Sequence, residues 1–376
     1  MKLFHLADLH LGKRVNGFSM LEDQSYVLKQ ILSLVDLKHP DGVMLCGDIY
    51  DKPVPSEEAV RVFDGFLHEL SRRNVSTYVI AGNHDSAERL SFGSKLMEGS
   101  KVYIADTFRG VTPPIVQEDQ LGPVNIYMLP FIKPAMVREA YPDADVHTYQ
   151  EAVEYVIGKM DVDPKERNIL MAHQFVTGAV RSESEDVNVG GLDNVDFEVF
   201  DAFDYVALGH IHRPQRVGRD EVRYSGTPLK YSFSEENDNK SLTFVEMNKK
   251  GKIRLTPFPM EVLRDMRTLR GTYEEVTARK NYDEKTRQDY IRVILTDEHD
   301  VPDAMNKLRY FYPNIMKLEY DNSRTREDRE ITASSAVEDR TPEELFEDFY
   351  LQQNNIEMTE EQKKYTEDLI RQVWEG

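Results

Sequence analysis

Short apolar runs alternate with stretches of helical periodicity in the first part of the chain. The runs at 2–7, 43–46 and 76–81 have the length and composition of buried strands. Between them, residues 20–37 and 56–70 carry apolar side chains three and four positions apart, which predicts two amphipathic helices. Alternating strands and helices favour an α/β layered fold, in which ligands bind at the carboxyl ends of the strands.

The pattern continues less regularly in the middle of the chain. It predicts a helix near 149–160 and strands at 124–129, 169–172, 205–208, 222–224 and 242–246. Around Pro257–Pro259 the pattern breaks. Beyond the break, a strand, a helix and a strand of a small α/β module are predicted at 289–295, 301–311 and 315–319.

Near its end the chain has a polar stretch without sustained periodicity, followed by two predicted helices. A capping box with proline at the first helical position begins at Thr341, and a second box begins at Thr359. The apolar faces of the helices are formed by Leu345, Phe346, Phe349 and Tyr350, and then by Tyr365, Leu369, Val373 and Trp374. These faces need an apolar surface to cover, and periodicity alone leaves open whether this chain or a partner provides it.

Composition and charge narrow the classes of protein that fit. The 376 residues are 40% apolar, which supports a packed core, and the net charge of −20 disfavours nucleic acid at first sight. However, residues 327–376 hold 15 Asp and Glu against 5 Lys and Arg, so half of the net charge lies there. No apolar run spans a bilayer, and Asp8 comes too early for a secretory signal, so we expect a cytoplasmic protein. The single cysteine, Cys46, excludes an internal disulfide and a multi-cysteine zinc site.

Five of the ten histidines lie in polar clusters directly after predicted strands. The clusters are Asp8-Leu9-His10, Gly47-Asp48-Ile49-Tyr50-Asp51, Gly82-Asn83-His84-Asp85, His173, and Gly209-His210-Ile211-His212. One such cluster can arise by chance, but together they supply carboxylate oxygens and imidazole nitrogens for two divalent metals. A metal pair is the usual device for phosphoester hydrolysis, because it makes hydroxide available near neutral pH and stabilises the leaving oxygen. His5 and Cys46, in contrast, are expected in the core.

This ordered set of motifs resembles the calcineurin-like metallophosphoesterases. The runs from Phe4 to Lys13, from Phe203 to Gln215 and from Tyr224 to Glu235 are also similar to the SbcD family of bacterial DNA-repair nuclease subunits. The resemblance implies a two-sheet α/β sandwich flanked by helices, with a small α/β capping module and C-terminal amphipathic helices. The implied division is a nuclease domain at 1–270, a capping domain at 271–325, a linker at 326–340 and a partner-binding helical segment at 341–376.

The resemblance also implies roles for individual side chains. One metal would be bound by Asp8, His10, Asp48 and His212, and the other by Asp48, Asn83, His173 and His210, with Asp48 as the bridge. His84 would contact the scissile phosphate and assist the leaving oxygen. Asp51 is the second candidate catalytic residue, but it stands where archaeal relatives carry a second active-site histidine, so a role in moving the phosphate or holding His84 is left open. Lys13, Arg14, Lys52 and Arg89 flank the motifs and are candidates for DNA phosphate contacts, with solvated surface charges as the alternative.

The activity implied is that of a manganese-dependent DNA nuclease, with magnesium also possible. It would act on double-stranded ends and hairpins as a 3′→5′ exonuclease and an endonuclease in DNA repair, recombination and replication. It would work as a nucleoid-associated homodimer with the ATPase SbcC, so that ATP enters only through the partner. The C-terminal helices would then dock on that partner, with their acidic faces complementing a basic surface. A phosphomonoesterase, a cyclic-nucleotide phosphodiesterase and a non-catalytic scaffold remain as alternatives, because fold and motifs do not fix the substrate.

Overall fold

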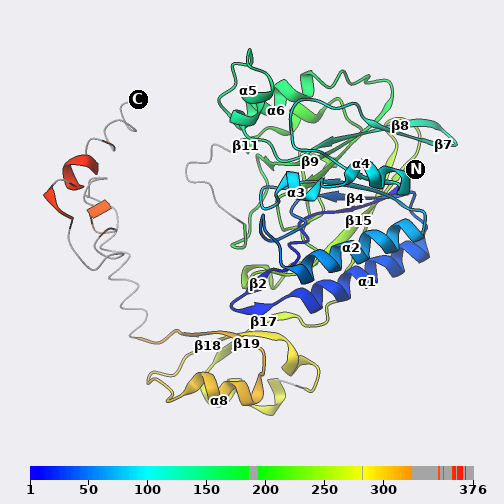
Figure 1. Ribbon diagram of the computed structural model, residues 1–376. Helices are drawn as coiled ribbons and strands as arrows, with labels where there is room; N and C mark the ends of the chain where they lie inside the picture. The colour runs from blue at the N-terminus through cyan, green and yellow to red at the C-terminus, as the bar shows by residue number, and fades with distance from the viewer. Residues whose placement is uncertain are drawn as a thin grey trace.

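The structure is a computed structural model of the whole chain (Figure 1). It describes residues 1–185, 194–281 and 283–323, and in the C-terminal segment residues 346–347, 350, 358–360, 362–366 and 369. Within these ranges no helix combines the length and the apolarity needed to cross a lipid bilayer.

The first of two six-stranded sheets contains the amino-terminal strand. Strands β1, β4, β5 and β6 run parallel, and β15 and β16 extend the sheet antiparallel on the other side of β1. The strand order is β16 (Ile253–Pro259), β15 (Ser241–Met247), β1 (Lys2–Leu6), β4 (Gly42–Cys46), β5 (Ser76–Ile80) and β6 (Val102–Ile104).

The second sheet has a parallel centre and antiparallel edges. Strands β14, β12, β9 and β8 pair in parallel, while β13 and β7 close the two sides. The order is β13 (Gln215–Val217), β14 (Arg219–Tyr224), β12 (Tyr205–Gly209), β9 (Arg167–His173), β8 (Gly122–Leu129) and β7 (Ile115–Asp119).

Helices cover the outer faces of the two sheets, so the domain has four layers (Figure 1). Helices α1 (Leu21–Lys38) and α2 (Glu57–Arg72) pack on the first sheet, and α5 (Pro134–Ala140) and α6 (Tyr149–Gly158) pack on the second. The Ser56 hydroxyl caps α2, and a capping box formed by Thr148 and Glu151 begins α6. The predicted two-sheet α/β sandwich flanked by helices is therefore confirmed.

Shorter elements join these layers. They are α3 (Ala87–Leu90), α4 (Ser94–Met97), the hairpin β2 (Arg14–Val15) with β3 (Phe18–Ser19), the pair β10 (Phe175–Val176) with β11 (Asn194–Val195), and the 3₁₀ turns η1 (Glu98–Ser100), η2 (Phe197–Phe200), η3 (Phe233–Glu235), η4 (Arg279–Asn281) and η5 (Thr286–Gln288).

A layer of apolar side chains fills the space between the two sheets. It includes Met44 and Cys46 from the first sheet and Met171 and Tyr205 from the second. The expected core positions of Cys46 and His5 are confirmed, since both side chains are buried. The His5 ring nitrogens face the Tyr205 hydroxyl at 2.9 Å and the Leu208 carbonyl oxygen at 3.1 Å, which links one sheet to the other.

The break in pattern around Pro257–Pro259 does not end the first sheet. Strand β16 runs through both prolines and pairs with β15 over its whole length. Proline lacks the N–H that a central strand needs, but β16 is the edge of its sheet, where a missing donor is tolerated. These prolines therefore mark an edge strand.

A small module follows the sandwich along the chain. Its parallel sheet has the order β17 (Met266–Gly271), β18 (Tyr290–Leu295) and β19 (Ile315–Tyr320), with helices α7 (Tyr273–Val276) and α8 (Ala304–Phe311). The boundary expected between residues 270 and 271 falls within β17, which sequence periodicity did not reveal. Strand β17 was not predicted. The predicted strand, helix and strand that follow it are present as β18, α8 and β19.

One buried carboxylate anchors the module to the sandwich. Asp23, on α1, accepts hydrogen bonds from Arg264 at 2.7 Å and from the Tyr290 hydroxyl at 2.7 Å. Lys230 reaches across to Asp265 at 2.8 Å. The module is therefore attached beside the loops that follow β14.

The described helical pieces of the C-terminal segment lie apart from the sandwich and from the small module (Figure 1). Of the apolar residues predicted to bind the partner, Leu345, Phe349, Val373 and Trp374 lie outside the described residues, whereas Phe346, Tyr350 and Leu369 are helical. The two helical pieces contact each other, because Gln362 donates to the Tyr350 hydroxyl at 3.1 Å and Lys363 pairs with Glu347 at 2.9 Å.

Candidate metal centre

The predicted site residues all follow strands of the parallel parts of the two sheets. Asp8 and His10 come after β1, Asp48 and Asp51 after β4, and Asn83 and His84 after β5. His173 ends β9, while His210 and His212 follow β12. Because β4 and β9 pack against each other across the sandwich, these carboxyl ends meet at one place.

The loops after β1 and β4 are bound to each other through their backbones. Asp8 N donates to the Gly47 carbonyl at 3.0 Å, and His10 N donates to the Asp48 carbonyl at 2.9 Å. The backbones of Asp8, His10, Asp48 and His210 have positive φ, which is uncommon outside glycine and is tolerated best by Asn, Asp and His. Strained backbone of this kind is typical of functional sites.

Gly209 is required at this site because no side chain fits there. A Cβ atom at this position would lie 1.8 Å from the Cys46 carbonyl oxygen and 2.7 Å from His173 Nδ1. Close approach of the two sheets therefore depends on a glycine where β12 meets β4.

Gly209→Ala is expected to lower the free energy of unfolding by about 3 kcal/mol, because strand backbone must shift to relieve the clash. Denaturant unfolding measures this change. Gly65→Ala in α2 is the matched control, because its Cβ meets nothing within 4 Å and alanine is the better helix former by about 1 kcal/mol. Equal stability of the Gly209 variant and the wild type would contradict the packing described above.

Four of the side chains form the first group of donors. Ligand atoms of Asp8, His10 and His212 lie within 4.8 Å of one another, and Asp48 Oδ2 is 3.7 Å from His10 Nε2. The Nε2 atoms of His10 and His212 face each other at 3.1 Å. Such a hydrogen bond requires a proton on one of the two nitrogens, and a cation shared by both would take the place of that proton.

The second group lies on the other side of Asp48. His173 Nε2 is 3.5 Å from Asp48 Oδ2 and 3.0 Å from Asn83 Oδ1, and His210 Nδ1 is also 3.0 Å from Asn83 Oδ1. His173 Nδ1 is 2.8 Å from the Cys46 carbonyl, so it is the protonated nitrogen and leaves Nε2 as the donor to the site. All seven predicted metal-binding residues are thus brought together, with Asp48 between the two groups.

The electrostatics of these buried groups suit divalent cations. Burial and the nearby Asp48 raise the pKa of Asp8 well above its usual value. Burial also acts to raise the pKa of Asp48, but His173, His10 and His84 outweigh it and hold that pKa low. Burial lowers the pKa of His173, yet the charges of Asp48 and Asp8 prevail and raise it to about 9. In the metal-free protein a proton on His173 therefore partly balances the carboxylates, and a metal ion would displace it.

The donor set fits the expected metals. Carboxylate and amide oxygens with imidazole nitrogens, and no thiolate, match the ligands preferred by manganese and, through the oxygens, by magnesium. In the described part of the chain His10 Nδ1 is buried without a hydrogen-bond partner. The ring is held by its neighbours instead, since it packs edge-on against His84 and His212 with centroids 4.8 Å and 5.0 Å away.

His84 lies at the mouth of the cluster and differs from the buried donors in its exposure. Its side chain is 23% exposed, and its Nε2 is 4.0 Å from Asp48 Oδ2. His84 N donates to Asp48 Oδ1 at 2.9 Å, and its Nδ1 is 3.1 Å from the carbonyl oxygen of Asp51. Nδ1 is therefore the donor, and Nε2 is directed away from this backbone contact.

Asp51 makes two separate contacts beside the cluster. Its carbonyl oxygen lies 3.1 Å from His84 Nδ1, while its carboxylate binds Lys13 at 2.8 Å and lies 3.8 Å from His10 Nδ1. Asp85, next to His84, accepts hydrogen bonds from the backbones of Ile49, Tyr50 and Gly82 at 2.9 to 3.0 Å. Asp85 thus holds the loops after β4 and β5 together.

The four residues predicted to contact DNA phosphates differ in their exposure and in their partners. Lys13 is paired with Asp51 and largely buried. Arg14 donates to the Gly17 carbonyl within the β2–β3 hairpin. Lys52 and Arg89 are exposed.

Several residues that support the site were not predicted from the sequence. Ser184, Glu185, Glu235 and Lys240 surround His212, and Gln24 donates to the His10 carbonyl oxygen at 2.7 Å. The sequence pattern could have indicated Gln24, because it is a polar residue on the buried face of a predicted amphipathic helix. No sequence pattern indicated Ser184 and Glu185, since they lie in a polar loop.

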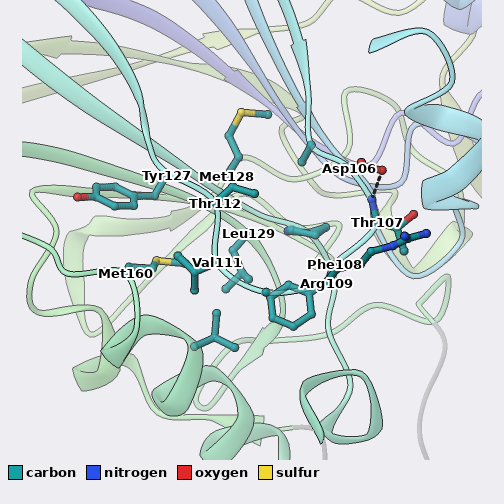
Figure 2. A pocket seen from close by; sticks show the side chains of 14 residues that line it. Asp106, Thr107, Phe108, Arg109, Val111, Thr112, Tyr127, Met128, Leu129 and Met160 are labelled. Carbon is teal, nitrogen blue, oxygen red and sulfur yellow. Dashed lines mark hydrogen bonds between the residues drawn. The ribbon is translucent and has the colours of Figure 1, made fainter. Parts of the chain in front are cut away.

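A separate cavity of about 210 Å³ lies between the loop before β7, strand β8 and helix α6 (Figure 2). Its lining includes Phe108, Val111, Leu129 and Met160, and none of the predicted site residues. It is therefore distinct from the metal centre.

Comparison with known proteins agrees with this geometry. Residues 1–214 match the family model described as calcineurin-like phosphoesterase, and residues 262–354 match one described as type 5 capsule protein repressor C-terminal domain. The first match covers more than half of the chain, so the protein is a calcineurin-like metallophosphoesterase. A crystal structure of a dimetal phosphatase from Danio rerio aligns with 69% of this chain and 96% of that chain, at a TM-score of 0.42 and 11% identity, values too low to support a conclusion.

Two curated relatives define the family more closely. The SbcD subunit of the SbcCD nuclease from Staphylococcus epidermidis is 34% identical over 322 residues, which are 85% of this chain and 85% of the relative. The SbcD subunit of the SbcCD nuclease from Staphylococcus saprophyticus is 32% identical over 384 residues, covering 100% of this chain and 99% of the relative. The chain belongs to the SbcD family of nuclease subunits.

Proposed function

We propose that the protein is a dinuclear, manganese-dependent DNA nuclease that acts with SbcC on DNA ends and hairpins as a 3′→5′ exonuclease and an endonuclease. The observation that carries this proposal is the convergence of seven donor side chains and His84 on one point between the two sheets. Magnesium could replace manganese at the oxygen donors, and ATP would act only through SbcC. The membership in a nuclease family supports DNA as the substrate.

In this proposal one metal is held by Asp8, His10, Asp48 and His212, and the other by Asp48, Asn83, His173 and His210. When bound, the two ions lower the pKa of water toward neutrality and balance the negative charge of the phosphate. The carboxylate of Asp48 lies between the groups and would bridge them. His173 would have to lose its proton to act as a ligand, so metal binding should strengthen as the pH rises toward 9, the pKa of His173.

His84 is the proposed group that acts on the leaving oxygen. With Nδ1–H donated to the Asp51 carbonyl, Nε2 carries a proton only in the imidazolium form. The imidazolium could donate that proton to the leaving oxygen, or stabilise its charge. Asp51 would thus act on His84 through its backbone, and its carboxylate would hold Lys13.

The phosphates of DNA would contact basic side chains next to the metal centre. Lys52 and Arg89 are exposed and available for phosphate contacts, and Arg14 lies on the neighbouring hairpin. Lys13 would reach a phosphate only by exchanging its partner Asp51. The small α/β module would help to present the duplex.

A nuclease assay tests the substrate class. Blunt duplex and hairpin DNA are offered with Mn²⁺, with and without SbcC, beside a small phosphomonoester and a cyclic nucleotide. Cleavage of DNA with little turnover of the small esters supports the proposal. The reverse preference would favour the phosphomonoesterase or cyclic-nucleotide phosphodiesterase, and inertness toward all substrates would favour the scaffold.

The proposed SbcC-binding surface is the C-terminal helical segment. Phe346, Tyr365 and Leu369 are exposed in the described residues, as a surface that a partner covers would be in the free subunit. The surplus of acidic residues beyond 326 would complement a basic partner surface.

Truncation after Ser335 is expected to leave a folded, metal-binding core that no longer binds SbcC, because the removed segment makes up the proposed interface. Size-exclusion chromatography of the mixed proteins measures complex formation, and manganese analysis confirms that the core is intact. Undiminished complex formation by the truncated chain would show that SbcC binds elsewhere.

A second copy of the chain is the other proposed partner. Leu96 in α4 and Phe92 just before this helix are 87% and 83% exposed, and both are close in sequence to His84. A second copy of the chain could join these two side chains into a larger apolar surface, which is the kind of surface found at protein interfaces. A homodimer through this face, located in the cytoplasm at the nucleoid, is part of the proposal.

A further inference from the structure

Glu235 is a fully buried carboxylate that lies behind the metal centre. It ends η3, and it forms an ion pair with the buried Lys240 at 2.5 Å. Its other oxygen accepts hydrogen bonds from Ser184 and, at 3.3 Å, from Ser182. A carboxylate paired with a buried ammonium stays ionised and can only accept hydrogen bonds.

This requirement fixes the direction of a chain of hydrogen bonds that ends at His212. The Ser184 hydroxyl donates its proton to Glu235, so the Ser184 oxygen can only accept from His212 Nδ1, which lies 2.6 Å away. His212 Nδ1 therefore carries the ring proton. Its Nε2 therefore carries a lone pair, which accepts a hydrogen bond from His10 Nε2 in the metal-free protein and is directed at the position of the first metal group.

We propose that Glu235, acting through Ser184, is a positioning residue that holds His212 in the Nδ1–H form with Nε2 directed at the metal site. This inference rests on the proposed dinuclear function. The Glu235 carboxylate is 3.8 Å from His212 Nδ1, so the serine hydroxyl is needed to connect the two groups.

The backbone of His212 is bound by neighbours of Ser184 and Glu235. Glu185 accepts a hydrogen bond from His212 N at 2.6 Å, and Lys240 donates to the His212 carbonyl oxygen at 2.8 Å. Ring, N–H and carbonyl are thus all bound by residues within two segments, at Ser182–Glu185 and Glu235–Lys240. For His173 the same orienting task falls to a backbone carbonyl, which a side-chain substitution does not remove.

The test uses the full chain with Ser184→Ala, and Ser184→Thr as the variant that restores the hydroxyl. In metal-free protein labelled with ¹⁵N-histidine, NMR reports the tautomer of each ring, and a His212→Asn sample assigns the signal. We expect His212 to be protonated at Nδ1 in the wild type and in Ser184→Thr, and to change to the other tautomer or a mixture in Ser184→Ala. Manganese titration should show roughly 10- to 100-fold weaker binding of one of two ions in Ser184→Ala.

Ser234→Ala is the matched control, because Ser234 lies next to Glu235 but its hydroxyl contacts Ser232 and the Glu183 backbone instead. It should keep the wild-type tautomer and both manganese affinities. An Nε2–H tautomer in the wild type, or unchanged tautomer and affinity in Ser184→Ala, would overturn the inference. The NMR result does not depend on metal, so failure of the dinuclear proposal is recognised separately: the wild type would then bind fewer than two ions.

Discussion

His84→Gln is expected to lower DNA cleavage roughly a hundredfold to ten-thousandfold while metal content stays at the wild-type level. The loss follows from the position of the ring at the mouth of the cluster, with Nε2 directed away from the backbone contact at Nδ1. Glutamine retains polarity but cannot transfer a proton. Initial rates on a labelled duplex, together with manganese analysis after gel filtration, measure the two quantities.

His147→Gln serves as the control for this substitution. His147 is a largely exposed histidine paired with Asp145 and lies outside the donor cluster, so its loss should leave the rate unchanged. A His84 variant that cleaves at the wild-type rate would remove this side chain from the proposed chemistry. A variant that loses its metals would show instead that His84 is a ligand.

Asp48→Ala is expected to remove both metals and all cleavage, because the carboxylate lies between the two groups of donors. His10 Nε2 and His173 Nε2 are 3.7 Å and 3.5 Å from the same oxygen, Asp48 Oδ2. Without it, four buried or half-buried imidazoles and Asn83 would have to bind the cations with Asp8 as the remaining carboxylate of the proposed ligand set. Manganese stoichiometry after dialysis is the decisive measurement.

Asp64→Ala, an exposed carboxylate on α2, is the control for that experiment and should keep two ions per chain. Retention of two ions by Asp48→Ala would refute the bridge. Retention of one ion would show that Asp48 serves a single site and that the other site is complete without it.

The location of the site could be predicted because strand ends carry the chemistry. The runs ending at residues 7, 46 and 81 were recognisable as strands, and each is followed at once by Asp or Asn with His or a second Asp. Their convergence follows from the geometry of parallel strands. The resemblance of the later motifs then placed His173, His210 and His212 with them, and the structure brings all of these groups together.

What could not be predicted depends on contacts between distant parts of the chain. The first sheet pairs β1 with β15, from opposite ends of the sandwich domain, and β16 carries prolines that only an edge position tolerates. The support of His212 by Ser184 and Glu235 arises from two loops about 50 residues apart, with no local periodicity to reveal it. The contact of His84 Nδ1 with the Asp51 carbonyl oxygen could not be predicted either, because any residue type supplies that oxygen.

The positive φ angles at Asp8, His10, Asp48 and His210 limit how this protein can change during evolution. At these positions the backbone conformation restricts the residue type independently of any metal, because β-branched side chains are poorly tolerated at positive φ. A descendant that no longer bound metal would still favour Asp, Asn, His or Gly at these positions. A relative that keeps these residues has therefore kept the loop conformation. It is expected to keep the activity only when the surrounding metal-binding residues are kept as well.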